Sequence, residues 1–364
     1  MVNLLDHGIS TLKNKNMKLR KLFDDNPNII INTDIDGILS GIILCKFCNC
    51  NIVGFTNSKD SVWLADGYDD LYKYVYIDMF VTNDEAICID QHVVAVNDAH
   101  MQSIIKLGNK YSPQSDDSNN LRVFSSKGFK YKYPFGTVQY LIAQLESEGV
   151  KIFLPDLYAS VPNSKIKIGD LLNRADDTMQ TTISSKYMKN AQDWWNWLDK
   201  KAPNGSIGKM KDYLEKMASS SDEVVDATNP VNGKKHKKEE YETRRKKIVG
   251  DIKAKTKDYF MEQFQCKSSD GGFSNIVDKH NNILPNIEKY IKAIALLFGI
   301  EDLNIPNHYI VHKGEARRTR WLDIFESDFL KDYTICGHKI FSYAFIYGPD
   351  NDGQTNFSFT IDMK

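Results

Sequence analysis

The residues of this sequence best suited to chemistry are aspartates at the ends of apolar runs. They are Asp34 and Asp36 in NTDIDGILS, Asp78 in YIDMF, Asp90 with His92 in IDQHV, and Asp176 with Asp177 in RADDT. A single aspartate in such a place is typical of a helix cap, because its carboxylate accepts hydrogen bonds from the first backbone amides of a helix. Several carboxylates that lie close together repel one another unless cations neutralise them. The whole set therefore favours a site for divalent metal ions.

Short apolar runs separated by helix-length segments must position these aspartates. The sequence predicts strands at 28–32, 52–55, 74–77 and 86–89, with a helix over 38–47 after the first strand. Three of the four strands have an aspartate at or just after their carboxyl end. This alternation predicts a parallel α/β sheet, and ligand sites in open parallel sheets lie at the edge where the carboxyl ends of the strands meet.

The remaining segments predict further helices and a β-hairpin. A leading helix is expected within 1–25, and clusters of Pro, Gly, Ser and Asn in 201–235 predict a connection around one short helix. The sequence also predicts a helix near 138–145, one from about Gly169, an aromatic helix at DWWNWLDKK, a long charged helix over 234–264, a helix over 284–299 and a closing hairpin in 339–364.

These elements predict an α/β protein with a parallel-sheet N-terminal domain and a smaller α+β C-terminal domain. We expect the first domain at 1–185, a helical connector at 186–265 and the second domain at 266–364. The expected arrangement is bilobal, with a central cleft that holds the aspartates.

The overall composition narrows the class of protein. Forty-seven Lys and Arg nearly balance 48 Asp and Glu, so the net charge is −1, and no global field is typical of a nucleic-acid coat or a membrane-surface binder. No apolar run approaches the roughly 20 residues that a membrane span needs. Six cysteines in 364 residues do not predict a disulfide framework, so we expect a cytoplasmic protein without a membrane partner.

In order and spacing, the aspartate motifs resemble those of the DHH phosphoesterases. This family includes RecJ-type single-strand exonucleases, nanoRNases, cyclic-dinucleotide phosphodiesterases and manganese-dependent family II pyrophosphatases. The resemblance covers roughly residues 28–182. IIINTDIDGILS is similar to the first motif, YIDM to the second, IDQHV to the Asp-His-His motif, and NRADD to the fourth.

The resemblance implies a centre with two divalent cations, Mn²⁺ or Mg²⁺. Its metal ligands would be Asp34, Asp36, Asp78 and Asp176, with Asp78 bridging the two ions. A centre of this kind hydrolyses phosphate esters by neutralising both the attacking and the departing oxygen.

The resemblance also implies catalytic and substrate-binding residues. His92 would contact the substrate phosphate or position the nucleophile, and Asp90 would be a metal ligand or would orient its neighbours. Ser40, in the helix after the first motif, would help to hold phosphate at that helix end.

In the second half of the chain the resemblance is weaker. Four residues are expected to bind substrate: Arg317, Arg318, Arg320 and His338. A guanidinium group matches phosphate geometry, whereas a run of arginines is also common in solvated turns. His338 is equally well explained as a histidine at a strand edge.

Two residues depart from the family motifs. Asn32 occupies a position where the family has His or Asp, and Gln91 replaces the first His of Asp-His-His. The remaining candidate metal ligands are almost entirely carboxylate oxygens, which Mg²⁺ and Mn²⁺ prefer. The same losses leave open a protein that binds phosphates without cutting them.

The function implied is a metal-dependent phosphodiesterase acting on short oligonucleotides or cyclic nucleotides. Two alternatives are a RecJ-like single-strand exonuclease and a catalytically impaired nucleotide sensor or sponge. The expected partner is a nucleotide or a short single-stranded nucleic acid, and a homodimer is left open. The basic helix in 234–255 predicts either a track for a nucleic-acid backbone or an ordinary solvated helix, because glutamates interrupt it.

Overall fold

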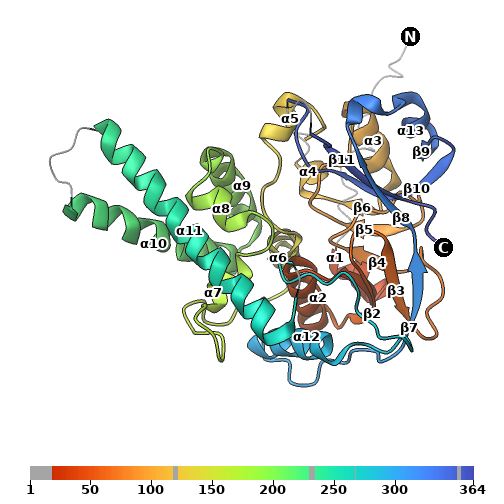
Figure 1. The fold of residues 1–364 in the computed structure, drawn as a ribbon, viewed down its shortest axis with the longest axis horizontal. Helices are drawn as coiled ribbons and strands as arrows, with labels where there is room; N and C mark the ends of the chain where they lie inside the picture. The colour runs from red at the N-terminus through yellow and green to blue at the C-terminus, as the bar shows by residue number, and fades with distance from the viewer. Residues whose placement is uncertain (1–18, 118–121, 229–233, 267, 351–353) are drawn as a thin grey trace, which may run out of the picture.

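The structure is a computed structural model that describes residues 19–117, 122–228, 234–266, 268–350 and 354–364 (Figure 1). These residues form a mixed α/β fold with one large, mainly parallel sheet and a separate small antiparallel sheet. The predicted α/β class and parallel sheet are therefore confirmed. The predicted division of the chain at residues 185 and 265 stays a prediction.

The large sheet has the strand order β6-β5-β4-β1-β2-β3-β7. The five strands from β6 to β2 run parallel, whereas β3 and β7 pair antiparallel at the edge. The strands are β1 (Asn28–Asn32), β2 (Asn51–Thr56), β3 (Ser61–Ala65), β4 (Val75–Ile77), β5 (Ile87–Ile89), β6 (Lys110–Tyr111) and β7 (Tyr309–Lys313).

Four of these strands, β1, β2, β4 and β5, were predicted from their apolar runs. Strand β3 and the two edge strands β6 and β7 were not, and β7 joins the sheet from far along the chain by pairing with β3. Residues 309–313 therefore pack with the large sheet, and the small sheet begins only at Glu315.

The small sheet has the strand order β8-β11-β10-β9. Its strands are β8 (Glu315–Thr319), β9 (Thr334–Ile335), β10 (His338–Phe345) and β11 (Phe357–Ile361). The antiparallel pair of β10 and β11 confirms the predicted closing hairpin, although residues 351–353 of its connection lie outside the described part.

The two faces of the small sheet differ in side-chain size. On one face Tyr343 lies opposite Phe359 and Phe345 opposite Phe357, and these rings pack in an aromatic core with Phe329. On the other face the register aligns small side chains, namely Ala316, Ser342, Ala344, Ser358 and Thr360. Side chains of successive residues in a strand point to opposite faces of the sheet. The second face therefore carries only small side chains here and leaves space above it.

Hydrogen bonds fix the small sheet against the segments that follow β4 and β5. The Thr82 N–H donates to the Phe341 carbonyl at 2.9 Å, and the Phe345 N–H donates to the Val93 carbonyl at 3.1 Å. The Tyr343 hydroxyl donates to the Val94 carbonyl at 2.8 Å. Strand β10 therefore lies beside the segments that carry Asp78 and His92.

Helices surround the large sheet and extend away from it. The longer ones are α2 (Ile35–Cys48), α3 (Asp98–Leu107), α6 (Thr137–Ser147), α9 (Met188–Lys201), α10 (Ser206–Thr228), α11 (Lys234–Phe264) and α12 (Pro285–Leu297). The shorter ones are α1 (Leu19–Asp25), α4 (Pro113–Asp116), α5 (Ser126–Lys130), α7 (Ile168–Leu172), α8 (Thr178–Ile183), α13 (Glu326–Asp332) and the 3-10 turn η1 (Trp321–Asp323).

The long helices predicted at 234–264 and 284–299 are confirmed as α11 and α12. The single short helix expected within 201–235 is wrong, because α10 runs unbroken for 23 residues. It pairs with α11, and Arg245 of α11 forms an ion pair with Asp222 of α10. Of the predicted leading helix, α1 is described and residues 1–18 lie outside the described part.

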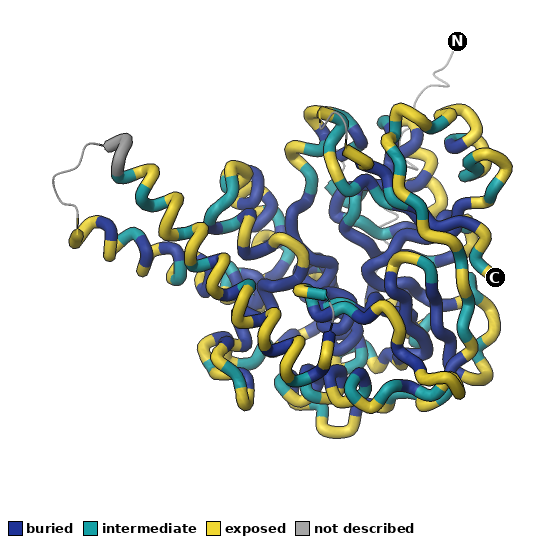
Figure 2. Tube along the Cα trace, viewed as in Figure 1, coloured by how far each residue is buried: buried dark blue, intermediate teal, exposed yellow. Residues whose placement is uncertain are grey.

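Figure 2 shows that buried residues concentrate in the sheets, whereas the arm formed by α10 and α11 is largely exposed. Among the described residues, no helix combines the length and the apolar character required to cross a membrane.

Candidate metal centre

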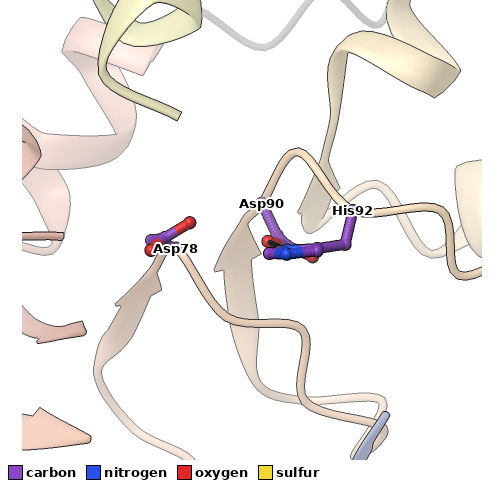
Figure 3. Close-up of side chains that lie close together, drawn as sticks. All are labelled: Asp78, Asp90 and His92. Carbon is purple, nitrogen blue, oxygen red and sulfur yellow. Dashed lines mark hydrogen bonds and ion pairs between the residues drawn. The ribbon is translucent and has the colours of Figure 1, made fainter. Parts of the chain in front are cut away.

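The carboxylates of the predicted motifs meet at the carboxyl edge of the parallel strands. Asp34, Asp78 and Asp90 follow β1, β4 and β5, which are neighbours in the sheet. Figure 3 shows Asp78 and Asp90 at the ends of adjacent strands, with the His92 ring beside Asp90. Asp36 lies in the first turn of α2, and Asp176 lies between α7 and α8.

Two groups of side chains in this region have the geometry to hold a metal ion. In one group, ligand atoms of Asp78, Asp90 and His92 lie within 4.8 Å of one another. In the other, ligand atoms of Asp36, Asp78 and Asp176 do so. Asp78 belongs to both groups, which is the arrangement needed for a residue that contacts two ions. The identity of a metal is not fixed by these distances.

Asp34 and Asp36 also act as helix caps. Asp34 is the N-cap of α2 and accepts a hydrogen bond from the Gly37 N–H at 3.1 Å. The Asp36 carboxylate accepts from the N–H groups of Thr137 and Val138, the first residues of α6, at 2.6 and 2.9 Å. Capping and metal binding are therefore compatible here, because each carboxylate oxygen has a second lone pair.

Asn32 and Gln91, the two residues that differ from the family motifs, each hydrogen-bond to the carboxylates through a side-chain amide. The Asn32 amide donates to Asp34 Oδ2 and to Asp78 Oδ2, each at 3.0 Å. The Gln91 amide donates to Asp176 Oδ2 at 2.6 Å. Each amide supplies partial positive charge to carboxylates that would otherwise repel one another.

His92 is held by Asp90. Its Nδ1 lies 2.8 Å from Asp90 Oδ1, and its Nε2 lies 3.2 Å from the Gln91 amide nitrogen. Burial lowers the pKa of the His92 imidazole, but the charge and hydrogen bond of Asp90 outweigh it and raise the pKa to about 9. Asp90 therefore orients the ring through Nδ1 and favours its protonated form.

The carboxylates have raised pKa values. Burial is the largest cause for each, and repulsion from neighbouring carboxylates adds to it for Asp34, Asp36 and Asp78. The pKa of Asp34 rises to about 6, and those of Asp36 and Asp78 rise well above the usual range. The Asp176 pKa also rises through burial, although His92 and Lys132 oppose the rise. Such a set favours the approach of positive charge.

The backbone is left-handed at two of these aspartates. Asp78 has φ of 62° and Asp176 has φ of 47°. Aspartate adopts this conformation more readily than most residues, but it still costs about 1 kcal/mol or more. Strain of this kind at two members of one cluster is typical of a functional site.

A glycine in the first motif allows α2 to begin close to β1. A Cβ added to Gly37 would lie 2.3 Å from the Asn32 carbonyl oxygen. We expect Gly37→Ala to destabilise the protein by about 1–3 kcal/mol or more, because backbone has to move. Gly250→Ala, in the open surface of α11, is the control and is expected to stabilise slightly. Urea unfolding of both variants measures this, and equal midpoints would contradict the expectation.

A cavity of about 630 Å³ lies over the carboxylates. Asp34, Asp78, Asp90, His92 and Asp176 line one side of it. The small-residue face of the small sheet lines another side, together with Arg318. Residues of 268–274, which follow α11, complete the lining.

The other predicted substrate residues do not reach this cavity. Arg317 pairs with Glu315, Arg320 with Asp323, and His338 lies 2.7 Å from Asp362. Ser40 is fully buried in α2. The structure thus brings Arg318 to the carboxylates and leaves Arg317, Arg320, His338 and Ser40 away from the cavity lining.

Several residues around the carboxylates were not predicted from the sequence. The Thr137 hydroxyl donates to Asp78 Oδ1 at 3.0 Å, and Lys59 lines the cavity. Arg174 forms an ion pair with Asp270 and donates to the Asp176 carbonyl at 3.2 Å, so it joins two segments of the rim. Thr137 and Lys59 lie outside the predicted motifs, and Arg174 lies within NRADD but was not assigned a role there.

The donor set fits a divalent metal ion. It consists of the buried carboxylates of Asp36, Asp78 and Asp90, the exposed carboxylate of Asp176 and one imidazole, and carboxylate oxygens are the ligands that Mg²⁺ and Mn²⁺ prefer. Comparison of the chain with models of known protein families, with curated proteins and with solved structures finds no match.

Proposed function

We propose that the protein is a metal-dependent phosphodiesterase of the DHH type, acting in a cleft between the large and the small sheet. The observation that carries the proposal is that two ligand groups share Asp78, which lines the same cavity as Arg318. The cavity is therefore lined by carboxylates that can hold cations and by a guanidinium that can bind a phosphate.

The side chains have distinct tasks in this proposal. Asp36, Asp78 and Asp176 would hold one ion, and Asp78, Asp90 and His92 the other. When bound, the ions supply Lewis acidity and neutralise negative charge on phosphate oxygens. Asp90 fixes the His92 ring through Nδ1, and Nε2 would be the ligand atom once its proton is displaced. The Thr137 hydroxyl and the Asn32 amide fix the two oxygens of Asp78.

The size of the cavity favours a small substrate. A volume of about 630 Å³ lies within the range of sites for small molecules and cofactors. A dinucleotide or a cyclic nucleotide is of suitable size, whereas a duplex is not.

The test is hydrolysis of a substrate panel. Linear and cyclic dinucleotides, oligomers of up to five nucleotides and pyrophosphate are incubated with Mn²⁺ or Mg²⁺ and separated by chromatography. We expect metal-dependent cleavage of a phosphodiester that is lost in Asp176→Ala. Asp177→Ala is the matched control, because Asp177 is exposed like Asp176 but belongs to neither ligand group. Equal activity of both variants, or cleavage in the presence of a chelator, would contradict the proposal.

A second candidate is a nucleotide-binding protein without turnover. The amides of Asn32 and Gln91 favour it, because they already satisfy oxygens of Asp34, Asp78 and Asp176. It predicts nucleotide binding by calorimetry with no product in either metal, so the same panel separates it from the phosphodiesterase.

The guanidinium of Arg318 is expected to bind substrate phosphate. Removing a hydrogen bond to a charged group costs about 1.5–3 kcal/mol, so Arg318→Ala is expected to raise KM roughly tenfold to a hundredfold with a smaller change in kcat. Arg317→Ala is the control, because Arg317 is on the other face of β8 and pairs with Glu315. Steady-state kinetics of the two variants measure the difference, and the same KM in both would contradict this role.

A further inference from the structure

Three lysines share one side of helix α11, in the arm that it forms with α10. Figure 1 shows this antiparallel pair projecting from the body that contains the sheets. Lys246, Lys253 and Lys257 of α11 are separated by seven and four residues, so they share one side of the helix. Gly250 lies between them, and nothing is within 4 Å of the position of its missing Cβ. We call this side the lysine flank.

From Lys246 to Asp258 the acidic residues of α11 lie away from the lysine flank, whereas Glu242 and Glu239, one and two turns before Lys246, lie on the same side. Asp251 and Asp258 are also seven residues apart, and at 100° per residue they are on the opposite side of the helix. In the described part of the chain, no ion pair is formed by Lys246 or Lys257. Between Lys246 and Lys257 the lysine flank therefore carries three lysines and no carboxylate of α11.

The lysine flank leads to the metal centre. The Lys253 ammonium lies 3.5 Å from Asp177 and donates to Gln180 Oε1 at 2.6 Å. Asp177 directly follows Asp176, which lines the cavity. Beyond its last turn, α11 continues into 268–274, which also line the cavity. A polymer that leaves the cavity past Asp176 therefore meets Lys253 first.

We propose that the lysine flank binds the backbone of a single-stranded nucleic acid whose end occupies the cavity. This inference rests on the proposed phosphodiesterase and adds a binding surface for the rest of the substrate chain. Lys246 and Lys257 are about 16 Å apart at 1.5 Å per residue. That distance spans about five phosphates at the 3.4 Å spacing of a stacked strand.

An exposed aromatic ring favours nucleic acid over a plain polyanion. The Tyr187 side chain is 37% exposed, and it precedes Met188, whose sulfur is 3.9 Å from Arg245 Nη1. Arg245 precedes Lys246 in α11, so Tyr187 belongs to a segment that contacts α11 next to the flank. Stacking of a base on an aromatic ring contributes about 1–3 kcal/mol, which a polyphosphate cannot gain.

Binding without hydrolysis tests the surface. Fluorescent oligothymidylates of 2, 5, 10 and 15 nucleotides are titrated with the full chain in EDTA, and anisotropy is measured at several salt concentrations. We expect affinity to rise with length beyond the two nucleotides that fit the cavity. In the double variant Lys246→Ala/Lys257→Ala, affinity for the 15-mer falls at least tenfold at 0.1 M salt, and the dimer is unaffected. The slope of log K against log salt falls by about 1.4, since two phosphate contacts are lost.

The matched control is Arg244→Ala/Lys255→Ala. These residues have the same spacing of eleven and the same charge change, but they lie on the other side of α11. Equal losses in both double variants, or no dependence on length in the wild-type chain, would overturn the proposal. Equal displacement by polyphosphate of matched charge, with no effect of Tyr187→Leu, would instead show a general polyanion surface.

The two proposals fail in different ways. If no substrate is cleaved but binding depends on length and on the lysine flank, the phosphodiesterase is wrong and the surface stands. If the dinucleotide is cleaved and longer strands bind no more tightly, the centre stands and the surface is wrong.

Discussion

Asp78→Asn is expected to reduce phosphodiesterase activity at least a hundredfold to a thousandfold, the range found when one preorganised electrostatic group is removed. Asp78 is the residue shared by both ligand groups, so one substitution weakens two ion sites. Asparagine keeps the shape of the side chain, and the Thr137 hydroxyl at 3.0 Å can donate to its oxygen or accept from its nitrogen. Lost activity then reports the missing charge instead of a misfolded sheet.

Calorimetric titration with Mn²⁺ distinguishes this outcome from an unrelated defect. The wild-type chain is expected to bind two ions, and Asp78→Asn is expected to lose at least one of them. Without metal, the variant is expected to melt at a higher temperature than the wild type, because a buried charge that burial and Asp36 disfavour is gone. Unchanged metal binding in Asp78→Asn, with Asp177→Asn as the comparison, would remove the basis of the metal centre.

The part of this centre that could be predicted from sequence is the part made by local elements. Strands β1, β4 and β5 are continuous apolar runs buried in a parallel sheet, and an aspartate follows each of them. Their carboxyl ends meet because parallel neighbours align the same ends. The proximity of Asp34, Asp78 and Asp90 could therefore be predicted, although these residues are far apart in the sequence.

Residues that depend on pairing between distant segments could not be predicted. Strand β8 reads EARRT, which has no apolar alternation, so the sequence could not separate Arg318 from Arg317. Only the register with β11 decides this, because it places Arg318 opposite Ser358 and Arg317 opposite Phe359. Lys59 reaches the cavity through a loop outside the predicted motifs, and the ion pair of Arg174 with Asp270 depends on a segment remote in sequence.

The error in α10 has a different cause. Ser and Asp in 219–222 favour turns in isolation, since their side chains compete for backbone hydrogen bonds. In the structure the helix continues through them because Leu214, Ala218 and Val225 are buried and α11 packs alongside. Tertiary contacts outweigh local propensity here, as they often do.

The free energy of unfolding of the metal-free protein is expected to fall as the pH rises from 6 to 8. The pKa values of Asp36 and Asp78 are raised well above 3.8 in the folded state, mainly by burial, so the folded chain holds protons that the unfolded chain has already released. Raising the pH removes these protons and leaves buried carboxylates that repel one another. Each such carboxyl group lowers the free energy of unfolding by at most about 1.4 kcal/mol per pH unit over the range in which it titrates.

The titration of His92 also lowers the free energy of unfolding as the pH rises. Its pKa rises from 6.5 to about 9 in the folded state, so its stabilising ion pair with Asp90 is complete below about pH 6.5 and is lost as the pH rises toward 9. Solvent screens this contribution, because about a third of the His92 side chain is exposed. The pKa of Asp34, near 6, adds to the fall at the lower end of the range.

Melting temperatures in EDTA and in excess Mg²⁺ measure this dependence. In EDTA the melting temperature is expected to fall between pH 6 and pH 8, and the fall is expected to be shallower in Asp78→Asn. In Mg²⁺ the fall is expected to shrink or reverse, because the ion binds the deprotonated carboxylates and stabilises the folded state more at higher pH. A metal-free melting temperature that rises over this range would mean that the cluster is already neutralised by the chain itself, with the amides of Asn32 and Gln91 sufficient for that purpose.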